Sequence, residues 1–275
     1  MSAILVIAGA EIRAALRNRW VLAITLLMAA LALSLAFLGS APTGTVGAGA
    51  LEVTVVSLSS LTIFLVPLIA LLLSYDAIVG EAERGTLLLL LAYPVSRVEV
   101  VLGKFLGHTA VLGLATCIGY GAAGLVLGWS EASPDWQSWM SFAGMIGSSV
   151  LLGTAFLALG YLVSVAVRDR GAAGGIAIGI WLLLVLIYDM ALLGALVADQ
   201  GRHITAGLFN DLLLLDPADV YRLFNLTGFK VSAFSGMAGL AGQAEFGRAT
   251  LLAALVAWIA APLTLAAFLF RRRQL

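Results

Sequence analysis

The side chains that could perform chemistry are few and lie far apart in the chain. His108 and His203 are the two histidines and Cys117 is the single cysteine, and no H-E-x-x-H or C-x-x-C motif is present. Gly103-Lys104 lacks both the earlier glycine and the following serine or threonine of a phosphate-binding P-loop. No G-x-S-x-G turn or paired Ser/His/Asp array is visible. The sequence therefore predicts no enzyme active site and no cofactor bound by this chain, and it leaves metal ligands unassigned.

The elements that would position any site are long and apolar. Of the 275 residues, 62% are hydrophobic and 11% are charged, whereas soluble domains have about 45–50% apolar and about 25% charged residues. Six blocks are long enough to cross about 30 Å of hydrocarbon at about 1.5 Å per residue, namely Trp20–Gly39, Ser57–Tyr75, Phe105–Trp129, Met140–Val167, Ala172–Ala198 and Ala249–Phe270. The predicted fold is an all-α integral membrane protein with one transmembrane domain over residues 1–275.

Basic residues indicate the orientation of these six helices. Eleven Lys and Arg residues fall on one predicted side, and they are Arg13, Arg17, Arg19, Arg84, Arg97, Lys104, Arg168, Arg170, Arg271, Arg272 and Arg273. By the positive-inside rule that side is cytoplasmic, so both termini are predicted to lie in the cytoplasm of a multi-pass protein of the bacterial inner membrane. The formal net charge is zero, which provides no basic field for nucleic acid.

Two further segments are predicted to lie along the membrane surfaces. Residues 1–19 place apolar side chains on one face of a helix over Ile4–Arg19, typical of an interfacial helix, although the same helix could simply extend the first span. Asp199–Arg248 is predicted to be a periplasmic loop with short helices. Leu208–Leu215 is amphipathic, and Asp216-Pro217 is a start signal for a helix that continues to Phe224.

The cytoplasmic segment 76–104, between the second and third spans, has the pattern of a short helix. Glu81 and Glu83 favour a helix N-terminus, an apolar run follows over Leu87–Leu91, and Pro94 ends the helix. The basic residues around it also permit a helix that lies among lipid headgroups and is held there by charge.

Small residues and one buried acid mark the fifth span. Gly171, Gly175 and Gly179 recur every four residues and line one helix face, which allows a second helix to approach closely, either in ordinary packing or at a dimer seam. Asp189 lies within the same span. A carboxylate at the bilayer centre costs about 2.5–3.5 kcal/mol, so Asp189 is a candidate for a translocation path, unless it lies near the outer headgroups and is simply solvated.

The cytoplasmic segment resembles a signature of the ABC-2 type permeases, E-x-E-x-G-T-L-x-x-L-L-x-x-P-V-S-R followed by G-K. The matching residues are Glu81, Glu83, Gly85, Thr86, Leu87, Leu90, Leu91, Pro94, Val95, Ser96, Arg97, Gly103 and Lys104. Glu11–Trp20 is similar to the elbow helix of that family, and the six-span plan covers the whole chain. The resemblance implies a coupling helix over Glu81–Ala92, with ATPase-coupling residues Glu81, Glu83, Arg84, Gly85, Thr86, Leu87, Pro94, Ser96 and Arg97.

The resemblance also implies partners and a role. It implies a lipid-embedded homodimer of the ABC-2 (type V exporter) class, bound to two copies of a separate cytoplasmic ABC ATPase that carries ATP and Mg²⁺. A narrower similarity, in Leu212–Leu223 and in length, is to permeases of nitrous oxide reductase maturation. That similarity implies a NosF-like ATPase, a NosD-like periplasmic partner and a role in copper-site assembly. The alternatives are a generic ABC-2 exporter of another substrate and a secondary transporter, for which Asp189 is the only deeply placed ionisable residue.

Overall fold

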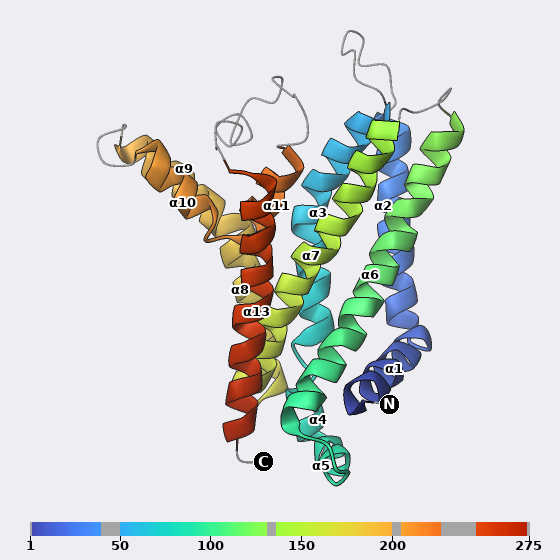
Figure 1. Cartoon of the computed structure of the whole chain (residues 1–275), viewed down its shortest axis with the longest axis vertical. Helices are drawn as coiled ribbons and strands as arrows, with labels where there is room; N and C mark the ends of the chain where they lie inside the picture. The colour runs from blue at the N-terminus through green and yellow to red at the C-terminus, as the bar shows by residue number, and fades with distance from the viewer. Residues whose placement is uncertain (1, 40–49, 131–135, 200–204, 227–245, 274–275) are drawn as a thin grey trace.

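The computed structural model describes residues 2–39, 50–130, 136–199, 205–226 and 246–273, and these residues contain helices and no strand. In chain order the elements are α1 (Ala3–Leu16), α2 (Arg19–Gly39), α3 (Ala50–Ser74), α4 (Val79–Glu83), α5 (Thr86–Leu91), α6 (Arg97–Ser130), α7 (Trp136–Ala166), α8 (Arg170–Leu182), the π-helical turn η1 (Leu183–Ile187), α9 (Tyr188–Asp199), α10 (Ala206–Leu213), α11 (Pro217–Leu226) and α13 (Arg248–Arg272). Both termini, α4 and α5 lie at the same end of the bundle (Figure 1).

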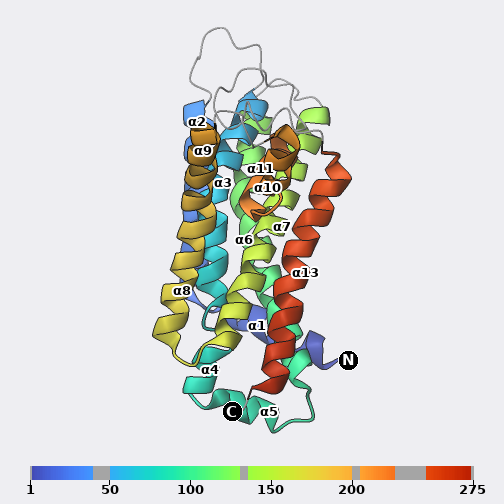
Figure 2. The ribbon, with the colours of Figure 1, turned by 90° about the vertical axis from the view of Figure 1, so that its left-hand side faces the viewer.

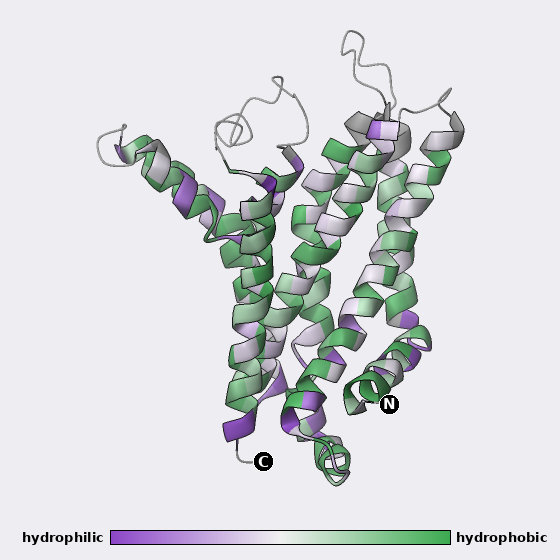
Figure 3. Cartoon of the chain, viewed as in Figure 1, coloured by the Kyte–Doolittle hydropathy of each residue, from purple (hydrophilic) through white to green (hydrophobic). Residues whose placement is uncertain are grey.

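The membrane-spanning elements agree with the predicted blocks. Five helices of the described residues are long and apolar enough to cross a membrane, or six if the bent pair of α1 and α2 forms one span. Hydrophilic side chains gather at the end that carries the termini and at α10 and α11, while the middle of the bundle is apolar (Figure 3). The chain is therefore a multi-pass membrane protein, as predicted.

Helix α7 forms the centre of the bundle. Of the most apolar stretch of α7, 72% is buried within the chain, compared with 17% for the α8–η1–α9 span and 22% for α13. Helices α3, α6 and α13 pack around α7, and α8 and α13 lie at the outside of the bundle (Figure 2). The α8–η1–α9 span and α13 therefore leave most of their surface uncovered by the described residues.

The third span begins earlier than predicted. Helix α6 starts at Arg97 rather than at Phe105, because Ser96 and Glu99 form a capping box. The backbone N–H of Ser96 donates to Glu99 Oε2 at 2.8 Å, and the N–H of Glu99 donates to Ser96 Oγ at 3.2 Å. Lys104, predicted to lie in a loop, is consequently inside a helix.

The first helix lies across the base of the bundle. Helix α1 is bent by 70° from α2, and it packs against α6 at two glycines. A Cβ atom at Gly103 would come within 2.8 Å of the Cβ of Ile7, and one at Gly107 within 2.6 Å of the Cβ of Glu11. This G-x-x-x-G pair brings the two helices into close contact and positions Glu11 beside α6.

Candidate functional site

The segment between α3 and α6 forms two short helices, so the prediction of one helix over Glu81–Ala92 was wrong. Helix α4 ends at Glu83 and α5 begins at Thr86. Gly85 between them has φ = 74°, a left-handed conformation that glycine adopts without a Cβ clash and that ends a helix. The hydroxyl of Thr86 donates to the carbonyl of Glu81 at 3.3 Å and links the two helices across the break.

Helix α5 presents an apolar tip at the end of the bundle. Leu87 is fully buried, but Leu88 is 60% exposed, Leu89 is 69% exposed and Tyr93 is 70% exposed. Large apolar side chains that remain this exposed next to a charged segment are typical of a surface that another molecule covers.

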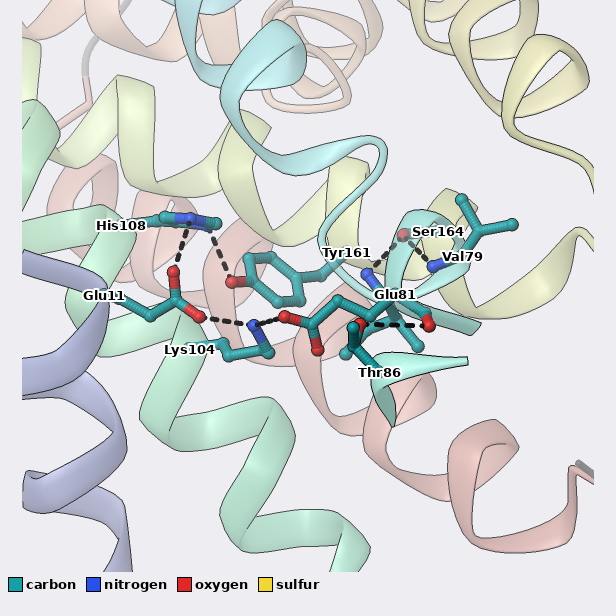
Figure 4. Close-up of polar contacts among 9 residues, drawn as sticks. Glu11, Val79, Glu81, Thr86, Lys104, His108, Tyr161 and Ser164 are labelled. Carbon is teal, nitrogen blue, oxygen red and sulfur yellow. Dashed lines mark hydrogen bonds and ion pairs between the residues drawn. The ribbon is translucent and has the colours of Figure 1, made fainter. Parts of the chain in front are cut away.

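Above α4, an ion-pair network joins three elements (Figure 4). The ammonium of Lys104 on α6 pairs with Glu81 of α4 at 2.8 Å and with Glu11 of α1. His108 Nε2 lies 3.6 Å from Glu11, and His108 Nδ1 is hydrogen-bonded at 2.8 Å to the hydroxyl of Tyr161 on α7. Lys104 is only 4% exposed, so the network holds α1, α4 and α6 together where solvent screening is weak.

Backbone hydrogen bonds fix the same segment to α7 and α8. Ser164 Oγ accepts the N–H groups of Ile78 and Val79 at 3.0 and 3.1 Å. Glu83 accepts the N–H of Arg170 at 2.7 Å, and the Arg170 side chain pairs with Asp76 at 3.1 Å. The segment 76–83 is therefore connected directly to three helices of the bundle, α6, α7 and α8, rather than lying free at its surface.

A polar cavity of about 530 Å³ opens beside this network. Its charged lining is balanced in sign, with Glu11, Asp76 and Glu81 against Arg84, Lys104 and Arg170. Arg84, one of the predicted coupling residues, contributes to this cavity, whereas Pro94 and Ser96 lie exposed between α5 and α6.

Arg97, the last predicted coupling residue, binds the end of another span. Its Nη1 donates to the carbonyls of Phe270, at 3.0 Å, and Arg273, and the guanidinium lies 5.7 Å from the centroid of the Phe270 ring. Arg273 in turn donates to the carbonyls of Ser164, at 3.3 Å, and Val165, at 2.9 Å. Two arginines thus donate to backbone carbonyls at the C-terminal ends of α13 and α7, where intrahelical N–H partners run out.

Asp189 lies in a second charged group, the aspartate–arginine cluster of Asp189, Asp216, Asp219 and Arg222. The Arg222 guanidinium pairs with Asp189 on α9, with its Nη2 2.7 Å from Oδ2 and its Nη1 3.3 Å from Oδ1. Arg222 also pairs with Asp219 on its own helix α11. Asp189 is therefore neutralised by a cation of the same chain, which the sequence analysis did not identify.

The predicted glycine face of the fifth span has no packing partner among the described residues. A Cβ at Gly175 or Gly179 would meet nothing within 4 Å, and one at Gly171 would meet only the Asp169 side chain. The side of α8 that packs inward carries Ala173 and Ala177, and the indole N–H of Trp181 donates to the carbonyl of Phe64 on α3 at 3.0 Å.

The structure brings together some predicted residues and adds others. Of the predicted coupling residues, Glu81 enters the network with Lys104, and Glu83 binds α8. Glu11, Asp76, His108 and Arg170 complete the site and were not predicted as site residues. Glu11 and Asp76 are far from Lys104 in sequence. Only the Gly103-x-x-x-Gly107 pair in α6 indicates that α1 packs there.

Comparison with known proteins agrees with this architecture. Residues 5–275 match the family described as ABC-2 family transporter protein. The chain is 48% identical over 278 residues to the "Probable ABC transporter permease protein NosY" of Pseudomonas aeruginosa, with 100% of both chains covered. It is 46% identical over 269 residues to the protein of the same name from Stutzerimonas stutzeri, with 97% of both chains covered.

Proposed function

Because the chain belongs to the ABC-2 transporter family, as a permease subunit, we propose that it couples ATP hydrolysis on a separate cytoplasmic ATPase to work across the bacterial inner membrane. The observation that carries this proposal is the exposed apolar tip of α5, Leu88, Leu89 and Tyr93, beside the anchored α4. In this proposal the α4–α5 segment is the coupling element, α1 is the elbow helix, and both termini are cytoplasmic. ATP and Mg²⁺ bind the partner ATPase.

The anchoring of α4 supports a coupling role over a lipid-bound surface helix. A helix that only lies among headgroups needs no fixed connection to the spans. Here Glu81 binds α6, Glu83 binds α8 and two backbone N–H groups bind α7. A displacement of α4 would therefore be transmitted to three spans, which is what a lever between an ATPase and a membrane domain requires.

The uncovered spans support a homodimer that carries two ATPase copies. The α8–η1–α9 span is 17% buried over its most apolar stretch, and its open face carries Gly175 and Gly179. Small residues let a second helix approach closely in a membrane, where packing rather than the hydrophobic effect drives association. This face is the proposed seam between two copies.

The proposed process is maturation of the copper site of nitrous oxide reductase, with a NosF-like ATPase and a NosD-like periplasmic partner. Its support is the 48% identity over the full length to the NosY permease. The second candidate is a generic ABC-2 exporter of another substrate. A secondary transporter is less favoured, because Asp189 is paired with Arg222 and not part of a series of ionisable residues across the described spans.

Co-purification tests the coupling proposal directly. The Leu88→Asp/Leu89→Asp variant should insert normally and lose the ATPase that co-purifies with the wild-type chain, because charge disrupts an apolar contact. Leu215→Asp changes a leucine of similar exposure, 59%, near α10, and should retain the ATPase. Equal recovery of the ATPase with all three proteins would refute docking at α5.

Complementation separates the two candidate processes. In a strain that lacks its own NosY, the chain should restore nitrous oxide reductase with its copper sites filled, and the Leu88→Asp/Leu89→Asp variant should not. Wild-type ATPase coupling without restored reductase would favour the generic exporter and leave the permease assignment unchanged.

A further inference from the structure

The aspartate–arginine cluster contains more negative than positive charge. Its three carboxyl groups have ligand oxygens within 4.8 Å of one another, and Arg222 is the one cation that the described residues place in contact with them. Asp216 is 0% exposed and Asp219 is 1% exposed. With every group ionised, the cluster would hold two uncompensated negative charges away from water, an arrangement that is very unfavourable.

Two carboxylate oxygens of the cluster have no partner. Asp216 Oδ1 accepts the N–H of Ala218 at 3.1 Å, but Asp216 Oδ2 and Asp219 Oδ2 are buried without a hydrogen bond among the described residues. A buried carboxylate oxygen needs a donor, a metal ion or its own proton. The two oxygens therefore point to a bound positive species.

The position of Arg222 argues against a metal ion as that species. Its guanidinium contacts both oxygens of Asp189 and one of Asp219, so it already occupies the centre of the carboxylate group. A metal ion beside it would be repelled by a fixed positive charge. A proton needs no coordination sphere, and it neutralises a carboxyl group in place.

The charged and titratable neighbours are few, and none donates to the free oxygens. The hydroxyl of Tyr188 donates to the carbonyl of Leu212 at 2.6 Å, and that of Tyr221 is hydrogen-bonded to Ser149 at 3.0 Å. Among the described residues, the charged and titratable groups near the two carboxyls are Tyr188 and Asp189 of α9 and Arg222 of α11. Tyr221 of α11 binds α7 instead, and Arg248 of α13 lies near Phe224 and Asn225 at the other end of α11.

We propose that Asp216 and Asp219 form a proton-binding site that holds α11 against α9, α7 and α13 when it is loaded. The proposal is independent of the transport role. Helix α11 packs against α7 and α13 and reaches α9 through the Arg222–Asp189 pair, and its apolar side packs with Leu192, Leu251 and Leu255 in one cluster. When the protons are lost, the negatively charged carboxylates of the cluster lie in contact and repel one another, which weakens the packing of α11 against its neighbours.

The direction of the pH response follows from the raised affinity for protons. Burial raises the pKa of the Asp216 carboxyl to about 8, and the adjacent Asp219 carboxylate adds to the rise. Burial also raises the pKa of Asp219 above its usual range, although Arg222 acts in the opposite direction. The folded chain thus binds more protons than the unfolded chain between the ordinary value, 3.8, and about 8, so its stability falls as pH rises through this window.

Infrared spectroscopy and thermal unfolding of the full chain in lipid nanodiscs test the site. A carboxylic-acid C=O stretching band should be present at about pH 6 and be lost at about pH 9, and Asp216→Asn should remove part of it. The midpoint of unfolding should fall by several degrees over the same range in the wild type. Asp216→Asn/Asp219→Asn, which mimics the protonated pair, should be nearly independent of pH.

Two controls make the outcome decisive. Asp211→Asn alters an exposed acid of α10 and should keep the wild-type response. The proposal is overturned if the double variant retains the full pH dependence, or if neither Asp216→Asn nor Asp219→Asn changes the band. It is also overturned if EDTA destabilises the wild type and Ca²⁺ restores it, because the cluster then holds a metal ion; absence of any EDTA effect supports the proton.

Discussion

Lys104 of α6 and Glu81 of α4 are ion-paired at 2.8 Å across 23 residues of sequence. The pair joins a membrane span to the segment proposed to meet the ATPase. Because the lysine is almost completely buried, removing one partner leaves an uncompensated buried charge, which costs more than breaking an ion pair on an exposed surface.

Lys104→Met should destabilise the fold. The change leaves Glu11 and Glu81 close together without their shared cation, and breaking a buried ion pair by removing one partner costs about 3–5 kcal/mol. Thermal unfolding of the purified chain measures the loss. Arg17→Met, which removes an exposed cation just after α1, should have little effect. The triple variant Lys104→Met/Glu11→Gln/Glu81→Gln should regain part of the stability, and a failure to do so would contradict the charge explanation.

Gly85→Val should uncouple the segment between α4 and α5. A residue with a Cβ pays about 1–2 kcal/mol in the left-handed region, and valine tolerates it poorly, so the turn at φ = 74° would change shape. We expect normal membrane insertion and reduced stimulation of the ATPase. Gly85→Asn should retain most of the stimulation, because asparagine adopts this conformation more readily. Equal activity of the valine and asparagine variants would show that the turn is not required.

Gly107→Leu should destabilise the single chain, whereas Gly175→Leu should not. A side chain at Gly107 collides with Glu11, whereas one at Gly175 meets open space, and overpacking typically costs about 1–3 kcal/mol. Unfolding in detergent should therefore occur at lower temperature only for Gly107→Leu. If this face is the dimer seam, Gly175→Leu should instead separate the two copies, so that multi-angle light scattering gives half the mass of the wild-type dimer. An unchanged mass would exclude this face as the seam between the two copies.

Arg222→Leu should destabilise the chain more than Asp189→Asn does. Removing the arginine leaves three buried or partly buried carboxyl groups without a cation, whereas in Asp189→Asn the Asp219 carboxyl stays beside Arg222 and can release its proton to pair with it. The midpoints of thermal unfolding of the two variants measure this order. The reverse order would contradict the charge balance described for the cluster, and full activity of Asp189→Asn would remove Asp189 from any translocation path.

Reporter fusions test the orientation. Both termini and α5 lie at one end of the bundle (Figure 1), and eleven basic residues predict that this end is cytoplasmic. A reporter after Leu275 should report the cytoplasm, and one inserted after Asp199 should report the periplasm. A periplasmic signal from the first fusion would invert the proposed topology.

An all-helical chain with about five to six long apolar spans could be predicted from the sequence, because hydrocarbon imposes one strong requirement on a helix, a long apolar surface. The charged site was harder to predict. Glu11 and Glu81 lie 93 and 23 residues from Lys104, and helical periodicity contains no information on which distant helices meet. The same limit applies to Asp189, whose partner Arg222 lies 33 residues later, in a short helix predicted within the periplasmic loop.

The sequence contains local signals for the start of α6 and for the break between α4 and α5. Ser96-Arg-Val-Glu99 is a capping box that starts α6 before the apolar block begins. Gly85 breaks the run of residues with helix-forming character, and its left-handed conformation divides the predicted helix into α4 and α5. In both cases the end signals, and not the length of the apolar run, mark where the helices begin and end.

The contact between Arg97 and the end of α13 can form only late in the synthesis of the chain. The carbonyls that receive the guanidinium, those of Phe270 and Arg273, lie 173 and 176 residues further along the chain. The ribosome therefore completes α6 long before these acceptors exist. Arg273 must likewise be synthesised before it can bind the carbonyls at the end of α7. The base of the bundle can therefore be closed only after α13 has been synthesised, so α6 and α7 lack these contacts in the earlier part of translation.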